Sequence, residues 1–466
     1  MFDKHCEKNI WVSERADFDG DGSFEKPFLK IQTALNCAVP GSVIVLFSGI
    51  YDEKVVVRDL CGTVDEPITI TAFNENAEDV ISHCEWYFYS AKDFVVKGIV
   101  FRKTINSAIS MIGESKRNSI KDCVFDECGE ISECAVFFGG SGGVSNVVEN
   151  CGFCAPKRAK NHIAVMISQS IDESEEKTMA NSKNSSVRFC RFNDCKTAVM
   201  EGSDENVSEL FGGHEVCDCL FENCQTGVKI KISGTQICGN IFKNTQNAVV
   251  NALGFENEIF ENRFENCENA VVINSDDATI GENCFINSKI TFDGDFNGKD
   301  TLPILILDNT FASDKNDEII SSQNKTASFA TKNIFYNCTV SSKNIGEKDN
   351  VFEKNDIFAD STNGDFSANI NYGCKSGAEK MFEIVEIPQV DIVEMFEKQK
   401  RGHINERAYG KRKHLSKKMI EERDLFIKSM CFQDESEEDE EIEMEAAPVG
   451  HRDLRPVGVD GELEDN

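Results

Sequence analysis

The sequence has little positive charge and no apolar run of transmembrane length. Its 49 Lys and Arg residues are outnumbered by 81 Asp and Glu residues, which gives a net charge of −32. This balance argues against nucleic acid or an anionic membrane as the main partner, because both carry negative charge. A membrane-spanning helix needs roughly 20 consecutive apolar residues. No run in this sequence approaches that length, so we expect no membrane segment.

Residues 1–30 lack the basic segment and the apolar segment of a secretory signal peptide. We therefore expect a cytoplasmic protein whose 20 cysteines are reduced. The central part of the sequence also lacks stretches suited to a helix of ten residues, because short β-forming runs alternate there with Asn, Gly and Asp. The leucine spacing of a leucine-rich repeat is absent as well.

What the sequence does contain is a repeat built on phenylalanine, clearest between residues 240 and 267. The unit reads Asn-x-Phe-x-Asn, then Cys, Thr or Ser, and after two more residues Ala-Val or Gly-Val. Successive steps from Phe221 to Phe335 are 21, 22, 21, 26 and 24 residues long. A period of this length indicates a stacked-repeat architecture. The anchors are Phe101, Phe125, Phe153, Phe192, Phe221, Phe242, Phe264, Phe285, Phe311, Phe335 and Phe352.

The pieces of each unit specify the kind of repeat. Three short strands and three turns form one coil of a right-handed parallel β-helix, in which equivalent side chains of successive coils stack into ladders. We expect this all-β solenoid to span residues 41–375, with Phe and Cys filling its interior and Asn at its turns. At least nine cysteines fall at repeat positions, so we expect buried thiols there. Cys151 and Cys154 have metal-ligand spacing, but no second pair accompanies them.

Both ends of the solenoid need covering. Residues 1–40 read as a strand and a short cap helix, because Ile31, Leu35 and Ala38 follow a helical period. Residues 376–432 read as a C-terminal cap with a partly helical extension. Residues 433–466 form a strongly acidic tail, which we expect to be disordered.

The N-terminal segments carry a family resemblance. Trp-Val-Ser at 11–13, Gly-Ser-Phe-Glu-Lys-Pro-Phe at 22–28 and Pro-Gly-Ser-Val-Ile at 40–44 are its first pieces, and Gly-Thr-Val-Asp-Glu-Pro-Ile at 62–68 is the last. This stretch resembles the pectin-lyase-like β-helix superfamily, in particular polysaccharide lyases of the chondroitinase B and alginate lyase type. The resemblance implies a carbohydrate-active or carbohydrate-binding protein acting on uronic-acid glycans.

A turn near the N-terminus offers a candidate cation site. Asp17, Asp19 and Asp21 alternate with Phe18 and Gly20 as in the start of a calcium loop. The twelfth position, which should be glutamate, is Phe28. The segment therefore reads either as a Ca²⁺ site or as an Asp/Gly turn before the cap helix.

The strand after each Asn-Cys turn is where the resemblance implies the catalytic groups. If Val of the Ala-Val pair points inward, the first outward positions are Ser110, Phe137, Met166, Met200, Lys229, Val250 and Val272. The next outward positions are Ile112, Gly139, Ser168, Gly202, Lys231, Ala252 and Asn274. Phe137, Met166, Met200 and Lys229 are thus candidates for substrate binding. An apolar stripe on a solenoid face calls for a sugar ligand, a protein partner or coverage by the C-terminal segment.

The same resemblance implies that Lys231 is the catalytic lysine. Its partner arginine would fall on Ala252, and acidic metal ligands would fall near Cys224 and Thr226, so the lyase set is incomplete. His214 is a second catalytic candidate, from the polar insertion 201–216, where Gly212-Gly213-His214 is similar to a polygalacturonase motif. A glycosidase also needs paired carboxylates, for which Asp276 and Asp277 are weak candidates.

Three further hypotheses therefore stay open beside that of a lyase-like protein. The first is a non-catalytic intracellular β-helix that serves as a scaffold for a protein partner. The second is a polygalacturonase-like glycosidase. The third is a trimeric fibre.

Overall fold

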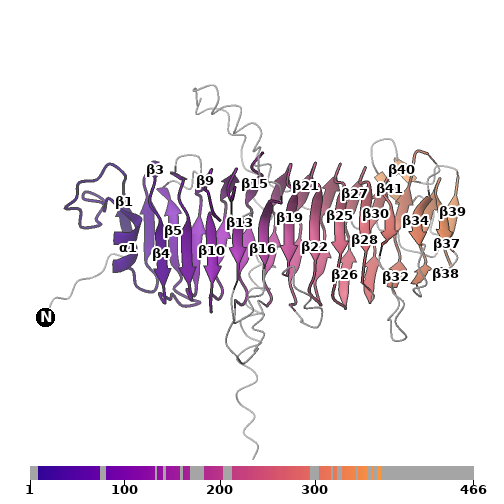
Figure 1. Cartoon of the computed structure of the whole chain (residues 1–466), viewed down its shortest axis with the longest axis horizontal. Helices are drawn as coiled ribbons and strands as arrows, with labels where there is room; N and C mark the ends of the chain where they lie inside the picture. The colour runs from indigo at the N-terminus through magenta and orange to yellow at the C-terminus, as the bar shows by residue number, and fades with distance from the viewer. Residues whose placement is uncertain are drawn as a thin grey trace, which may run out of the picture. The chain divides into compact units, whose positions relative to one another are not determined.

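The computed structural model describes residues 9–73, 80–131, 134–139, 143–157, 161–167, 183–202, 212–275, 277–293, 304–315, 318–322, 328–342, 345–354, 358–360 and 365–368. In these residues almost all regular structure is parallel β-sheet (Figure 1). The predicted C-terminal cap at 376–432 and acidic tail at 433–466 lie outside the described residues.

Three long parallel sheets run side by side along the described chain. Sheet A contains 14 strands: β1 (Asn9–Val12), β2 (Val43–Leu46), β5 (Ile68–Ala72), β8 (Phe94–Lys97), β11 (Ser119–Lys121), β14 (Val147–Glu149), β17 (Ser186–Arg188), β20 (Glu215–Cys217), β23 (Gln236–Cys238), β26 (Asn257–Phe260), β29 (Ala278–Gly281), β32 (Ile304–Leu307), β35 (Ser328–Thr331) and β38 (Ile345–Lys348). Sheet B contains 13 strands: β3 (Gly49–Tyr51), β6 (Val80–Ser82), β9 (Val100–Arg102), β12 (Val124–Asp126), β15 (Gly152–Cys154), β18 (Arg191–Asn193), β21 (Leu220–Glu222), β24 (Ile241–Lys243), β27 (Arg263–Glu265), β30 (Cys284–Ile286), β33 (Thr310–Ala312), β36 (Ile334–Tyr336) and β39 (Val351–Glu353). Sheet C contains 12 strands: β4 (Val55–Arg58), β7 (Trp86–Tyr89), β10 (Ile109–Ile112), β13 (Cys134–Phe138), β16 (Ile163–Ile167), β19 (Thr197–Glu201), β22 (Thr226–Ile230), β25 (Asn247–Asn251), β28 (Asn269–Ile273), β31 (Ile290–Phe292), β34 (Glu318–Ser322) and β37 (Thr339–Ser342). The strands β40 (Phe358–Asp360) and β41 (Asp365–Ala368) form a separate antiparallel pair.

Each coil contributes one strand to each sheet, in the order A, B, C, as β23, β24 and β25 do. Each strand pairs in parallel with its equivalent in the next coil, so that Phe242 lies opposite Phe264 and Val249 opposite Val271. This arrangement confirms the predicted right-handed parallel β-helix. The number of residues in one repeat is therefore the number of residues in one coil of the β-helix.

The phenylalanine anchors form one continuous stack inside the helix. Neighbouring rings from Phe101 to Phe352 lie 4.5–5.3 Å apart between centroids and within 6–12° of parallel. All the anchors except Phe352 are at most 1% exposed. The predicted core is thereby confirmed, and a β-strand spacing between coils is what sets the ring spacing.

A hydrogen-bonded ladder runs beside this stack, two residues before each phenylalanine from Phe125 onward. Asn262 is typical: its Nδ2 donates to Ile237 O at 2.8 Å, and its Oδ1 accepts from the backbone N–H of Asn240 at 3.0 Å. In upstream coils the same position holds cysteine. Cys219 Sγ donates to Val187 O at 3.6 Å and accepts from Cys190 N–H at 3.4 Å. Asn and Cys therefore satisfy buried backbone groups that the turn leaves unpaired.

Asparagine has a second use at the other end of the same strand. Asn223, Asn244 and Asn266, each two residues after a phenylalanine, have φ of 55°, 50° and 52°. Asn tolerates this left-handed conformation better than most residues. The two asparagines of Asn-x-Phe-x-Asn thus do different work: the first forms the ladder and the second makes the turn.

The N-terminal end is capped as predicted. The helix α1 (Ile31–Cys37) buries Ile31 and Leu35, and Ala38 follows directly after it, also buried. The Glu53 carboxylate accepts the backbone N–H of Ile31 at 2.5 Å, which satisfies a free donor at the start of the helix. In the part of the chain that the structure describes, no helix is long and apolar enough to cross a membrane.

Candidate functional site

The outer face of sheet C is the candidate site. The interior positions Val199, Val228, Val249 and Val271 are fully buried, so their neighbours along the strand face outward. The register aligns the predicted outward residues in one column: Ser110, Phe137, Met166, Met200, Lys229, Val250 and Val272 are successive Cα partners. The column continues to Tyr87 at one end and Thr291 at the other.

The chemistry of this face differs from that of the other two. Sheet A carries ion pairs on its outer face, such as Arg188 with Glu149 at 3.1 Å. Sheet B does too, as Arg191 with Glu222 at 2.7 Å shows. On sheet C, going from β7 towards β31, the outward side chains are instead first aromatic and apolar, then lysine, and then amides and hydroxyls. Phe137 and Met166 are partly exposed, whereas Met200 is only 6% exposed.

A hollow of about 370 Å³ opens where the column changes from apolar to polar. Its amides are connected: Asn269 Nδ2 donates to Asn247 Oδ1 at 2.9 Å, and Thr291 Oγ1 donates to Asn269 Oδ1 at 2.9 Å. The lining residues are Asn247, Val250, Asn269, Val272, Asn274, Thr291 and Asp293. Such a mixture of amides, one hydroxyl, one carboxylate and apolar carbon suits a sugar, whose rings offer both polar edges and apolar faces.

The two predicted lysines lie one coil before this hollow. Lys229 is in β22 and partly exposed, while Lys231 follows the strand and is 9% exposed. Gly202 makes room for Lys231, since a Cβ at Gly202 would lie 2.9 Å from the Lys231 Cβ. In the next coil, Ala252 occupies the equivalent position, because its N–H bonds to Ile230 O at 3.0 Å. The structure therefore offers no guanidinium at that place.

The remaining positions that the resemblance assigned to metal ligands also lack carboxylates. Cys224 is 2% exposed and donates from Sγ to Phe192 O at 3.8 Å, as an interior ladder residue. Thr226 is at the start of β22 and pairs in register with Thr197.

His214 lies inside the β-helix, although the sequence suggested a loop. It is fully buried, and its Nδ1 accepts the backbone N–H of Ser185 at 3.2 Å. Burial lowers the pKa of His214 to about 4, so the imidazole is neutral at physiological pH. Residues Asn118, Asn146 and Asn257 accept backbone N–H groups at equivalent turns, so His214 replaces an asparagine of a second internal ladder. This geometry favours a structural role.

The three N-terminal aspartates are exposed and occupied with local contacts. Asp21 Oδ1 accepts the backbone N–H of Ser23 at 3.0 Å, and Asp19 pairs with Lys26 at 3.6 Å. The carbonyl of Asp17 accepts the N–H of Gly20 at 3.3 Å. Among the described residues, one group of three metal-ligating side chains lies close together, and it is on sheet A rather than here. Calcium at Asp17, Asp19 and Asp21 stays a prediction.

The structure adds residues on sheet C that the sequence reasoning missed. Tyr87 and Tyr89 project from β7, with their rings stacked 6.2 Å apart. Lys54 lies 4.4 Å from the Tyr87 ring centroid, and Arg58 lies 4.1 Å from that of Tyr89. The alternating Trp-Tyr-Phe-Tyr pattern at 86–89 was the available signal, because it places both tyrosines on one face.

Buried beneath this face is one carboxylic acid. Glu201 ends β19, is fully buried, and accepts the hydroxyl of Thr235 at 2.6 Å. Burial raises the pKa of Glu201 to about 7. Because Glu201 lies inside the β-helix, it does not contact a ligand on the outer face of sheet C.

Comparison with known proteins identifies the fold. A mannuronic-acid-specific polysaccharide family 6 lyase from human gut microbiota matches with a TM-score of 0.51 and 15% identity, over 76% of this chain and 88% of that one. The family 6 alginate lyase AlyGC matches with a TM-score of 0.55 and 15% identity, over 81% of this chain and 58% of that one. A family 6 polysaccharide lyase from Pseudopedobacter saltans matches with a TM-score of 0.50 and 18% identity, over 73% of this chain and 95% of that one.

The chain has the fold of these lyases. The suspected likeness to β-helix polysaccharide lyases is thereby confirmed for the fold, which by itself does not fix the activity. No family model matches the sequence, and no curated protein does.

Proposed function

We propose that the chain binds a uronic-acid polysaccharide along the outer face of sheet C. The observation that carries the proposal is the continuous column in which Phe137, Met166 and Met200 lead into Lys229 and the amide-lined hollow. Apolar side chains pack on the carbon faces of sugar rings. The Asn247 and Asn269 amides suit ring hydroxyls, and the Lys229 ammonium attracts a uronate carboxylate.

Two further considerations support a uronic-acid glycan. The lyases with this fold include one specific for mannuronic acid and an alginate lyase. In addition, sheet C carries cations at two places in a chain with a net charge of −32: Lys54 and Arg58 lie over the tyrosines of β7, and Lys229 lies in β22, one coil before the hollow. Local positive charge of this kind is what an acidic protein needs to hold an anionic polymer.

Binding is proposed rather than cleavage because the elimination chemistry needs more groups than this face supplies. A cation must neutralise the uronate, a base must take the α-proton, and a further group must assist the leaving oxygen. Lys231 is the candidate base. Ala252, Cys224 and Thr226 occupy the places of the other groups. Cleavage is therefore the second candidate function, favoured by Lys231 alone, and calcium belongs to that candidate.

A binding titration tests the proposal. Isothermal titration with alginate oligosaccharides should give saturable binding, and Lys229→Ala should raise the Kd roughly tenfold, which corresponds to about 1.4 kcal/mol. Lys243→Ala is the matched control, because Lys243 lies on sheet B, where it pairs with Glu265 at 3.6 Å. An equal effect of both substitutions, or no binding by the folded wild type, would contradict the proposal.

A second assay separates binding from cleavage. The protein is mixed with a panel of uronic-acid polysaccharides, with calcium or with chelator, and the ultraviolet absorbance of the unsaturated product is followed. The binding proposal predicts no product. Calcium-dependent product that disappears in Lys231→Ala would establish the lyase instead.

The scaffold reading remains as the alternative, with a protein partner on the same apolar column. A cytoplasmic location stays a prediction. A partner that competes with the oligosaccharide for sheet C would favour this reading over glycan binding.

A further inference from the structure

Two cysteines on the outer face of sheet A break the pattern that the other repeat cysteines follow. Cys123, Cys151, Cys190 and Cys219 lie in the interior ladder, where each Sγ donates to a backbone carbonyl. Cys217 instead directly follows Val216, and Cys238 directly follows Ile237, and both of these preceding residues are fully buried and face inward. Since side chains alternate along a strand, both thiols project outward.

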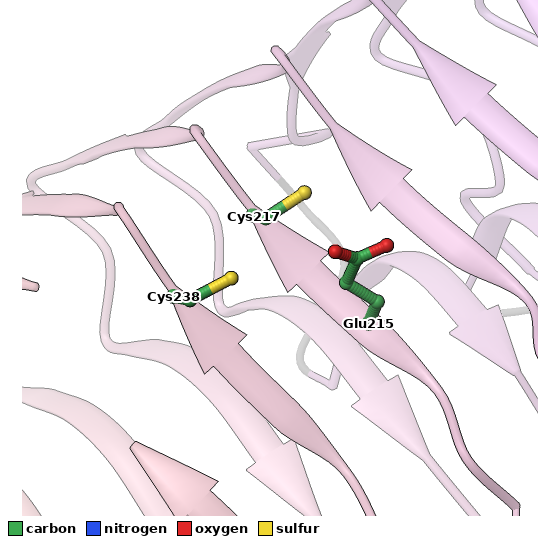
Figure 2. Close-up of side chains that lie close together, drawn as sticks. All are labelled: Glu215, Cys217 and Cys238. Carbon is green, nitrogen blue, oxygen red and sulfur yellow. The ribbon is translucent and has the colours of Figure 1, made fainter. Parts of the chain in front are cut away.

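These two thiols face each other across neighbouring coils. Cys217 in β20 and Cys238 in β23 are direct Cα partners of a parallel pair. Glu215 precedes Cys217 by two residues and projects from the same face of β20 (Figure 2). The two Sγ atoms and a carboxylate oxygen of Glu215 all lie within 4.8 Å of one another.

We propose that Glu215, Cys217 and Cys238 form a binding site for a thiophilic divalent metal ion, with zinc as the ion that suits it. Tetrahedral zinc with Zn–S bonds of about 2.3 Å places two sulfur ligands about 3.8 Å apart. The two Sγ atoms lie at most 4.8 Å apart, so a side-chain rotation of about 1 Å or less brings them to this sulfur–sulfur distance. Two thiolates select against Ca²⁺ and Mg²⁺, which take oxygen ligands.

The surroundings are compatible with a cation. Arg188 is the Cα partner of Cys217 on the other side, but its guanidinium is turned to Glu149, with Nη2 3.1 Å from the carboxylate. Glu215 and Asp218 are the carboxylates beside Cys217, whereas Glu149 is paired with both Arg188 and Lys121. Cys217 is 7% exposed, while Cys238 and Glu215 are partly exposed, so the ion has a route from solvent and would then be largely enclosed.

Binding needs no redox step. Each thiol loses its proton to solvent, the metal ion accepts two sulfur ligands and one carboxylate oxygen, and a water molecule takes the fourth position. The ion would connect two successive coils on the face away from the proposed glycan site. A role in holding these coils together follows directly, and it is independent of the proposed function.

Cobalt titration tests the site, because tetrahedral cobalt–thiolate centres absorb visibly and show a sulfur-to-metal charge-transfer band. The reduced full-length chain should gain these bands with one equivalent of Co²⁺ and lose them when Zn²⁺ is added. Cys217→Ser and Cys238→Ser should each abolish the charge-transfer intensity of this centre. Glu215→Gln should keep the sulfur band and raise the Kd for Co²⁺ at least tenfold.

Cys61→Ser is the matched control, since Cys61 is also partly exposed but lies elsewhere on the surface. It should leave the spectrum unchanged. Zinc should also raise the Tm of the wild type and of Cys61→Ser, but not that of Cys238→Ser. Cobalt bands that survive both cysteine substitutions, or wild-type protein without such bands, would overturn the proposal. A Cys217–Cys238 disulfide that persists under reducing conditions would overturn it as well.

Discussion

The substitution Asn262→Ala removes one member of the internal amide ladder. The Asn262 side chain donates to Ile237 O at 2.8 Å and to Asn283 Oδ1 at 3.1 Å. It also accepts two bonds from Asn240, one from the backbone N–H and one from Nδ2, both at 3.0 Å. Alanine leaves the N–H of Asn240 and the carbonyl of Ile237 buried without these partners.

The magnitude follows from these two orphaned groups. Each buried polar group that loses its partner costs about 1–3 kcal/mol. We therefore expect Asn262→Ala to lower the free energy of unfolding by about 4 kcal/mol. Urea denaturation followed by circular dichroism measures this, with the m-value as the check that the same unfolding transition is compared.

Two control variants sharpen the result. Asn262→Cys should lose clearly less than the alanine variant, because the chain itself uses cysteine at this position in Cys219. Glu258→Ala, at an exposed position of the same coil, should change stability by less than about 0.5 kcal/mol. The reasoning is refuted if alanine costs less than about 1 kcal/mol, or if cysteine costs as much as alanine.

Three further predictions concern the core, the buried acid and a glycine with positive φ. Phe221→Ala should lower the free energy of unfolding by about 3–5 kcal/mol, measured by urea denaturation, because it leaves a cavity in the ring stack; a loss below 1 kcal/mol would contradict this. Glu201 has a folded-state pKa raised from 4.5 to about 7, so stability should fall as pH rises from about 4.5 to 7 and then level off. Glu201→Gln should remove that pH dependence and gain about 3 kcal/mol at pH 8, and parallel pH profiles would contradict it. Gly202→Ala should lower the Tm, because Gly202 has φ of 87° and little space beside Lys231. Gly281→Ala is the control and should leave the Tm unchanged, because a Cβ there has its nearest neighbour at 3.5 Å. Equal Tm shifts in the two variants would contradict the prediction.

The solenoid could be predicted from the sequence because its repeat is visible as a regular spacing of residues along the chain. Each coil contacts chiefly its two neighbours, so a repeated Phe necessarily stacks on its equivalent. The number of residues from Phe221 to Phe242 is the length of one coil. This repeat spacing also predicts the register of sheet C, and with it the column from Phe137 to Lys229.

The features that were missed depend on inserted loops and on the faces of sheets other than C. The sequence predicts His214 in a loop because it lies within the polar insertion 201–216, yet the chain re-enters the solenoid one residue before β20 and buries it. Cys217 and Cys238 are 21 residues apart, which matches one coil, but the motif centres on the phenylalanine and drew attention to Cys219 instead. Whether a lysine such as Lys231 is accessible depends on packing with Gly202, which repeat spacing does not encode.

The most direct test of the proposed function is a crystal structure of the chain with a uronic-acid oligosaccharide. The account predicts sugar rings along sheet C, packed on the partly exposed Phe137 and Met166 and extending past Lys229 over the hollow at Asn247 and Asn269. Rings bound on sheet A or sheet B, with sheet C empty, would contradict it.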